Sequence, residues 1–192
     1  MTQQKTERIF LIINEFAGHR QAAKAVELVI PFLKNNGKAV EYSFTNHPGH
    51  ATDLARQASA GGFDLVVAVG GDGTVNETAL GLVGTETPMG IIPMGSGNGL
   101  ARELGIPMNM RKSARTLIDG NTLHLDVCTL NNQRFLCTSG IGFDALVADK
   151  MSKASSRGFL KYVQLVVQES IFFKPVAVKM KIDGKALERF VF

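Results

Sequence analysis

A strand-like run that leads straight into a cluster of glycines constrains this chain more than any other feature. Residues 64–69 are mostly apolar and are followed at once by Gly70-Gly-Asp-Gly-Thr74, where a helical pattern begins. Glycines let backbone N–H groups approach phosphate oxygens, and the first turn of a helix adds unpaired donors and partial positive charge. The pattern predicts a phosphate-binding turn with a carboxylate, Asp72, inside it. The alternative is that Asp72 or Thr74 only caps the helix.

The first 120 residues alternate short apolar runs with helical patterns. Continuous apolar strands bounded by glycine are typical of a parallel sheet that helices cover on both faces. We expect strands near 8–14, 39–44, 64–69 and 89–92, and helices near 20–35, 50–60, 74–83, 99–104 and 109–118. This order predicts an α/β fold, a three-layer Rossmann-like domain over residues 1–120, with ligands at the carboxyl ends of its strands.

A second glycine-rich loop, Gly95-Ser-Gly-Asn-Gly99, also follows a strand and precedes a helix. Loops at the carboxyl ends of neighbouring parallel strands can face one crevice, so we expect the two loops to converge. Neither loop has the spacing Gly-x-x-x-x-Gly-Lys-Ser/Thr or Gly-x-Gly-x-x-Gly. A P-loop NTPase and a conventional dinucleotide dehydrogenase are therefore disfavoured.

The pattern changes after residue 120. We expect strands at 123–130, 133–139, 176–182 and 187–192 and a helix near 157–171, with turns at Asn131-Asn132 and Asp183-Gly184. Such turns between strand patterns are typical of antiparallel hairpins. Because the last strand would leave an open sheet edge, we expect the β-rich domain, residues 121–192, to be incomplete. A small natural appendage that pairs with another chain is the alternative.

Composition excludes several classes of protein. Cys128 and Cys137, the only cysteines, have apolar or strand-like neighbours, so we expect buried, reduced thiols in a cytoplasmic protein. The apolar run Ile9–Ile13 is too short for a signal peptide or a membrane span. The net charge is only +4, without Trp or a dense Lys/Arg stripe, so nucleic-acid binding is not expected. Lacking a third ligand at metal spacing, His47 and His50 are expected to be loop and helix-start residues.

Several short motifs together resemble the diacylglycerol-kinase-type catalytic domain. This family is shared by bacterial lipid kinases, sphingosine kinases and ceramide kinases, and more distantly by NAD kinases. The motifs are Asn14 to Gly18, Thr45 with Gly49-His50-Ala51, Gly70 to Glu77, Pro93 to Ala101, Asp126, and Ser139 to Ala145. The resemblance covers nearly the whole chain and implies a nucleotide domain followed by the beginning of a β-sandwich domain for the lipid.

The same resemblance implies ATP as the phosphate donor and Asp72 as the catalytic residue. Asp72 would lie close to the reacting hydroxyl and to a magnesium ion, which it would hold directly or through water. The nucleotide-binding residues implied by the two glycine-rich motifs and the earlier strand ends are Asn14, Gly18, Thr45, Gly70, Gly71, Asp72, Gly73, Thr74, Val75, Asn76, Glu77, Gly95, Ser96, Gly97 and Asn98.

Four charged residues of the second region are further candidates. By the resemblance, Asp144 and Asp149 occupy positions of polar contacts to a lipid head group, although solvated or helix-capping carboxylates explain them equally well. Arg157 and Lys161, one turn apart, could reach the nucleotide phosphates or form a solvated basic face. The apolar stretch 159–173 could line an acyl-chain pocket or touch a membrane, but core packing is the preferred interpretation.

These observations lead us to expect an ATP-dependent lipid kinase. With Mg²⁺, it would transfer the γ-phosphoryl group to a hydroxyl of a lipid such as diacylglycerol or a sphingoid base. Two alternatives stay open, namely phosphoryl transfer like that of NAD kinases and a non-catalytic nucleotide-binding module. A lipid substrate implies peripheral contact with a membrane surface. The sequence leaves open which lipid is used and whether the chain forms a homo-oligomer.

Overall fold

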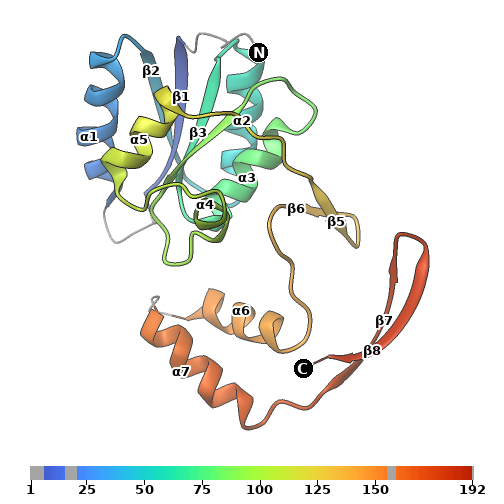
Figure 1. Cartoon of the computed structure of the whole chain (residues 1–192). Coiled ribbons are helices and arrows are strands. Elements are labelled where there is room, and N and C mark those ends of the chain that lie inside the picture. Colours follow the sequence, from blue (N-terminus) through green and yellow to red (C-terminus); the bar gives the residue numbers. More distant parts are fainter. Residues whose placement is uncertain (1–6, 16–20, 155–158, 192) are drawn as a thin grey trace. The chain divides into compact units, whose positions relative to one another are not determined.

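The computed structural model describes residues 7–15, 21–154 and 159–191 (Figure 1). Gly18 and Arg157, two of the predicted site residues, lie outside these ranges. Backbone contacts group the chain into two compact units, Met1–Cys137 and Thr138–Phe192. The first unit contains the region predicted as the nucleotide domain, and the boundary predicted at residue 120 stays a prediction.

The first unit is built on one parallel sheet. Along the chain it holds β1 (Arg8–Asn14), α1 (Gln21–Asn35), β2 (Ala39–Thr45), α2 (His50–Ala60), β3 (Leu65–Gly70), α3 (Asp72–Leu82), β4 (Met89–Pro93), α4 (Gly99–Glu103), α5 (Met110–Asp119), β5 (Cys128–Leu130) and β6 (Gln133–Phe135). The strand order is β2-β1-β3-β4 with every pair parallel, so that Ile9 lies opposite both Val40 and Leu65. Helices form the crossovers, as parallel neighbours require. The predicted α/β class is confirmed.

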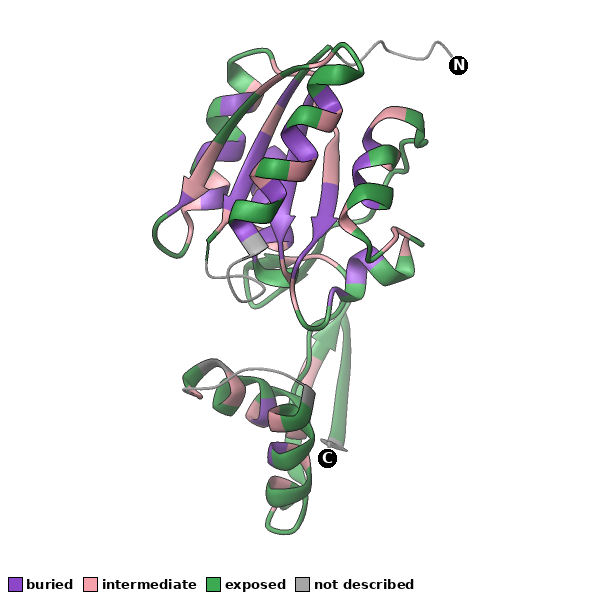
Figure 2. Ribbon diagram, turned by 90° about the vertical axis from the view of Figure 1, so that its left-hand side faces the viewer, coloured by how far each residue is buried: buried purple, intermediate pink, exposed green. Residues whose placement is uncertain are grey.

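Helices cover both faces of this sheet because its central strands are apolar at successive positions. Leu11 and Ile13 of β1 pack in one core cluster with α1 and α5, while Ile12 packs with α2 in a second cluster. In β3, Val67 belongs to the first cluster and Val66 to the second. Figure 2 shows the buried strands between helices. Since side chains alternate across a strand, a continuous apolar run is what fills two cores at once.

Helix starts in this unit follow from local capping. α3 begins at Asp72, two residues earlier than predicted, because Gly71 in extended conformation is its N-cap. α5 follows Asn109, whose side-chain oxygen accepts hydrogen bonds from the backbone N–H groups of Arg111 and Lys112. The other helices of the unit agree with the prediction to within a residue or two.

The hairpin of β5 and β6 is shorter than predicted. Pairing is limited to residues 128–130 with 133–135. Asn131 and Asn132 form the turn with φ angles of 47° and 64°, in the left-handed region that asparagine tolerates. Residues 123–127, expected to be strand, are exposed and have no strand assignment. The turn was predictable from its residues, whereas the length of the pairing was not.

The second unit contains two helices and one hairpin. They are α6 (Phe143–Lys153), α7 (Phe159–Ser170), β7 (Val176–Ile182) and β8 (Lys185–Val191). The Lys150 ammonium of α6 lies 2.6 Å from the Glu169 carboxylate of α7. β7 and β8 pair antiparallel through the predicted Asp183-Gly184 turn. The antiparallel strands are thus confirmed, α6 was not predicted, and the β-sandwich stays a prediction.

Two expectations about burial were wrong. Cys128 and Cys137 are free thiols, as predicted, but both are exposed. The side chains of Leu160 and Phe172 are 84% and 79% exposed, so most of the apolar face of α7 does not pack in a core, although Leu165 is buried. Cys128 belongs to a two-stranded hairpin and α7 packs against one other helix, which is too little structure to cover these side chains. Among the described helices, none is long and apolar enough to cross a bilayer.

Candidate functional site

The two glycine-rich loops meet at the carboxyl ends of β3 and β4. The backbone N–H of Met94 donates a hydrogen bond of 2.7 Å to the carbonyl of Gly70. A Cβ placed on Gly95 would lie only 2.6 Å from the Cα of Gly71. Backbones can approach this closely only where both residues lack side chains. The predicted convergence of the loops is therefore confirmed, and the glycines are its physical cause.

Asp72 joins the two loops through its carboxylate. Its Oδ2 accepts a hydrogen bond of 2.8 Å from the backbone N–H of Asn98. The N-cap of α3 is Gly71, and no side chain caps this helix. Asp72 is in the first helical turn, where a negative charge interacts favourably with the helix dipole. The alternative reading of Asp72 or Thr74 as a plain cap is therefore not supported.

Asn98 holds the second loop in its shape. Its Oδ1 accepts a hydrogen bond of 2.8 Å from the N–H of Gly95, and its Nδ2 donates one of 2.7 Å to the carbonyl of the same residue. The residue is buried and has a φ of 54°, a left-handed conformation that asparagine adopts more readily than most residues. The side-chain amide of Asn98 thus stabilises the conformation of the loop. Ser96, two residues earlier, is exposed.

A hydrogen bond links the end of β1 to the start of α3. Asn14 Nδ2 donates to the Thr74 hydroxyl at 3.0 Å. The Thr74 side chain packs over Gly70, where an added Cβ would collide with its hydroxyl. Thr74 is buried although it belongs to the first turn of a helix. The sheet edge and the glycine turn are thereby held together as one structure.

A pocket of about 280 Å³ opens beside this link. Its lining residues come from the carboxyl ends of two strands and the first turns of two helices. They are Asn14, Thr45, Asn46, His47, Pro48, Ala51, Gly73, Thr74 and Glu77. Five of these were predicted site residues, and the other four belong to the segment from the end of β2 to the start of α2. Their position directly after a parallel strand is the signal that could have identified them.

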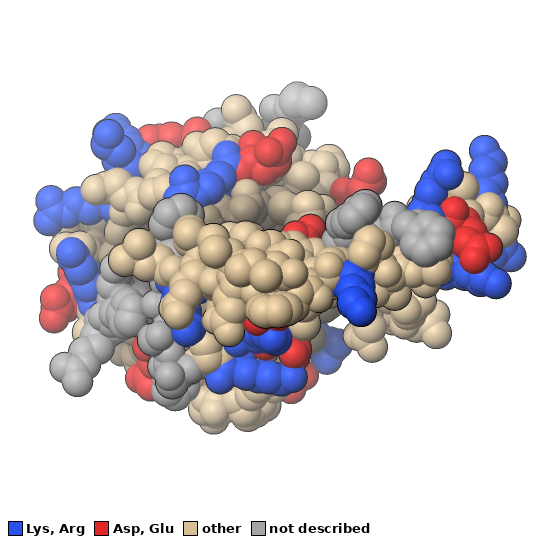
Figure 3. Space-filling model, turned by 90° about the horizontal axis from the view of Figure 1, so that it is seen from below, with Lys and Arg blue, Asp and Glu red and all other residues tan. Residues whose placement is uncertain are grey.

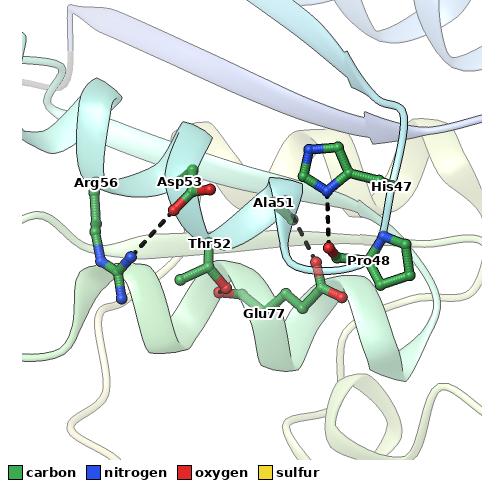
Figure 4. Close-up of polar contacts among 7 residues, drawn as sticks. All are labelled: His47, Pro48, Ala51, Thr52, Asp53, Arg56 and Glu77. Atoms are coloured by element: carbon green, nitrogen blue, oxygen red, sulfur yellow. Dashed lines mark hydrogen bonds and ion pairs between the residues drawn. The ribbon is translucent and has the colours of Figure 1, made fainter.

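The far wall of the pocket is made by α2 and α3, which are bonded to each other (Figure 4). The hydroxyl of Thr52 donates to the carbonyl of Glu77 at 2.8 Å, and Glu77 Oε2 accepts a bond of 3.3 Å from the N–H of Ala51. A carboxylate at the first turn of α2 is favoured by the dipole of that helix. His47 and His50 lie beside this wall with their rings stacked 4.8 Å apart.

Two predicted nucleotide-binding residues use their side chains elsewhere. Val75 is buried in a core cluster with Ala68 and Ile91, and its N–H is bonded within α3. Asn76 Oδ1 accepts a hydrogen bond of 3.2 Å from the backbone N–H of Leu136. Neither residue lines the pocket, although both are next to pocket residues in the sequence motif.

The remaining candidates belong to the second unit. Asp144 is exposed in the first turn of α6. Asp149 forms an ion pair of 2.7 Å with Lys153, and Lys161 Nζ donates to Gln164 Oε1 at 3.3 Å. Their roles toward a lipid head group and toward phosphates stay predictions.

The first unit carries no excess of basic residues. Residues 1–137 contain 12 Lys and Arg and 12 Asp and Glu, whereas residues 138–192 contain 9 and 5, so the excess of +4 lies entirely in the second unit. Basic and acidic side chains are interspersed on the face seen in Figure 3. The pocket lining includes no Lys or Arg among the described residues. An anion in this pocket would be attracted by N–H groups and helix starts and not by basic side chains of the described lining.

The donor set at Asp72 suits magnesium better than a metal that needs a full protein cage. No group of three or more His, Cys, Asp or Glu side chains in the described ranges could hold a metal ion. Mg²⁺ is usually bound by one or two carboxylates together with waters and substrate phosphates. Asp72 is exposed, and one of its two carboxylate oxygens, Oδ2, accepts the hydrogen bond from Asn98.

Comparisons with known proteins agree with this geometry. A family model described as the diacylglycerol kinase catalytic domain matches residues 8–130. A diacylglycerol kinase of Mycobacterium tuberculosis is 32% identical over 184 residues, which are 92% of this chain and 60% of that protein. Sphingosine kinase 1 of Arabidopsis thaliana is 30% identical over 139 residues, 66% of this chain and 29% of that protein.

A solved structure shares the fold as well. The crystal structure of a diacylglycerol kinase from Bacillus anthracis superposes with a TM-score of 0.76 at 29% identity, covering 98% of this chain and 63% of the other. The chain spans about three fifths of the length of the Mycobacterium tuberculosis relative. From the family match, the identity to these relatives and the shared fold, the chain belongs to the diacylglycerol kinase catalytic domain family.

Proposed function

We propose that this chain is the nucleotide-binding part of an ATP-dependent lipid kinase, which transfers the γ-phosphoryl group to a hydroxyl of diacylglycerol, a sphingoid base or a similar lipid. The observation that carries the proposal is the pocket at the carboxyl edge of the sheet, where Gly73 and Thr74 of the glycine turn meet Asn14 and Thr45 of the strand ends. Family membership and the kinase names of the relatives support the reaction class.

Each part of the site has a role in this reaction. N–H groups at the start of α3 bind phosphate oxygens, and the side chains of Asn14, Thr45 and Thr74 orient them. Asp72 accepts the proton of the lipid hydroxyl at Oδ1 as the new O–P bond forms and the bond to the β-phosphate oxygen breaks, so that ADP leaves. Bound Mg²⁺ would supply charge neutralisation on the phosphates.

A substitution that fills the pocket tests nucleotide binding. Gly73 lines the pocket, and an added Cβ there would meet no atom within 4 Å, so Gly73→Leu starts its side chain in open space and adds bulk at the pocket wall. We expect the Kd for MgATP in isothermal titration to rise about tenfold or more. Ala60→Leu, an equally exposed change on α2 away from the pocket lining, is the control and should leave the Kd unchanged.

The transfer step needs a second measurement. Asp72→Asn should retain folding and abolish ³²P transfer from labelled ATP to lipid vesicles that contain diacylglycerol or sphingosine. A parallel titration with NAD tests the alternative that the phosphoryl acceptor is a nucleotide, because that alternative predicts that NAD binds as well. The nucleotide-binding proposal fails if MgATP does not bind, and the role of Asp72 fails if Asp72→Asn keeps the transfer activity of the unsubstituted protein.

A further inference from the structure

Asn76 fastens a distant segment to the helix that carries Asp72. Its Oδ1 accepts the hydrogen bond from the N–H of Leu136, sixty residues later in the chain. The Leu136 side chain packs against the core cluster that contains Val75 and Leu100. The chain immediately after β6 is therefore held against α3 by one polar and one apolar contact.

Cys137 follows directly and lies, like Asp72, close to Gly99. Its backbone has a φ of 73°, a left-handed conformation unusual for a residue other than glycine, asparagine or aspartate. The Cys137 sulfur is 3.9 Å from the point where a Cβ on Gly99 would stand, and Asp72 Oδ1 is 3.8 Å from the same point. The thiol and the carboxylate oxygen thus border one spot above Gly99, and both residues are exposed.

This spot is distinct from the nucleotide pocket. Gly73 and Thr74 line the pocket, whereas Asp72, the second glycine-rich loop and Cys137 do not. The Asp72 carboxylate is directed to the second loop, where Asn98 binds its Oδ2. A hydroxyl that reached Oδ1 from the side of Gly99 would pass Cys137.

We infer that Cys137 is a specificity-determining contact for the acceptor alcohol and that Asn76 is the positioning residue that holds it there. The inference rests on the proposed function, because only phosphoryl transfer requires an acceptor at Asp72. A thiol packs well against hydrocarbon and carries little charge. The size of residue 137 then sets how much bulk an acceptor can carry next to its reacting hydroxyl.

The positioning role of Asn76 can be tested without measuring catalytic activity. In a Cys128→Ser background, which removes the other exposed thiol, the rate of Cys137 modification by Ellman's reagent reports how the segment is held. Asn76→Ala removes the acceptor for the Leu136 N–H and should accelerate modification about tenfold through local opening. Asn76→Asp keeps a side-chain oxygen at this position and should restore the slow rate. Equal rates in all three proteins would overturn the positioning role.

The acceptor contact is tested by alkylating Cys137 with N-ethylmaleimide in the same background. Transfer of ³²P to diacylglycerol vesicles should fall about tenfold or more while the Kd for MgATP changes by less than about twofold. A Cys137→Ser protein, which has no thiol at this position, should show the same transfer rate before and after treatment with N-ethylmaleimide. Unimpaired transfer after complete alkylation would overturn the contact. Loss of MgATP binding in the untreated protein would refute the proposed function instead, and the thiol rates would still decide the positioning role of Asn76.

Discussion

Replacing Gly95 by alanine should disrupt the contact between the two glycine-rich loops. The new Cβ would lie 2.6 Å from the Cα of Gly71 and 2.9 Å from Asn98 Oδ1. The first of these contacts is with backbone, which cannot rotate away, so one of the two loops has to move. Movement of the second loop would in turn strain the two hydrogen bonds between Asn98 and Gly95.

The expected cost follows from these contacts. Overpacking of a close backbone contact costs about 1–3 kcal/mol, and weakening of the Asn98 bonds adds about 1 kcal/mol, so Gly95→Ala should destabilise the first unit by about 2–4 kcal/mol. Gly73→Ala is the matched control, because its Cβ meets nothing within 4 Å and alanine favours the helix by about 1 kcal/mol.

Hydrogen exchange measured by mass spectrometry on peptides that span β3 reads the stability of this unit alone. Exchange in β3 should be faster in Gly95→Ala than in the native protein and no faster in Gly73→Ala. If Gly95→Ala exchanged as slowly as its control, the argument that close backbone contact joins the two loops would be refuted.

Two further predictions concern charges away from the site. The backbone N–H groups of Arg8 and Glu7 donate hydrogen bonds of 2.8 and 2.9 Å to the Asp64 carboxylate, and these bonds, with that of Arg8 first, lower the pKa of Asp64. The charged carboxylate therefore stabilises the folded protein above about pH 4, and this contribution is lost as the pH falls through the lowered pKa. The urea midpoint of Asp64→Asn should therefore fall less between about pH 6 and pH 3 than that of the native protein, and an equal fall would contradict the assignment. In the second unit, Lys150→Met leaves the largely buried Glu169 carboxylate of α7 without its ion-pair partner. The free energy of local unfolding, measured by hydrogen exchange in α7, should fall by about 1–2 kcal/mol. Lys153→Met, which breaks an exposed pair, should cost less than about 0.5 kcal/mol, and similar costs for both would disprove the difference.

The parallel sheet was predictable because it follows from the local composition of its strands. β1 and β3 are apolar at successive positions, and only a strand buried on both faces needs this composition. The hairpin turns were predictable for a similar reason. Asn131, Asn132 and Asp183 occur where the backbone has positive φ, which few other residues adopt without cost.

Other features could not be read from the sequence. α6 was missed because Phe143–Lys153 mixes apolar, small and charged residues without a clear helical face. Burial of the two thiols was wrongly expected because strand-like neighbours say nothing about whether another layer covers the strand. Asn76 belongs to the glycine motif, yet its amide bonds to a residue sixty positions away, a contact that no local pattern encodes.

The sequence by itself therefore determined the strands, most helices, the turns and the two glycine-rich loops, since each depends on the conformational preferences of neighbouring residues. The tertiary structure alone decided that Gly71 and Gly95 touch, that Asp72 bonds to Asn98, and that Cys137 lies close to Gly99. The pocket residues between β2 and α2 also became part of the site only when two parallel strands ended at the same edge. Such contacts join segments far apart along the chain, and their geometry exists only after the sheet and its helices have packed.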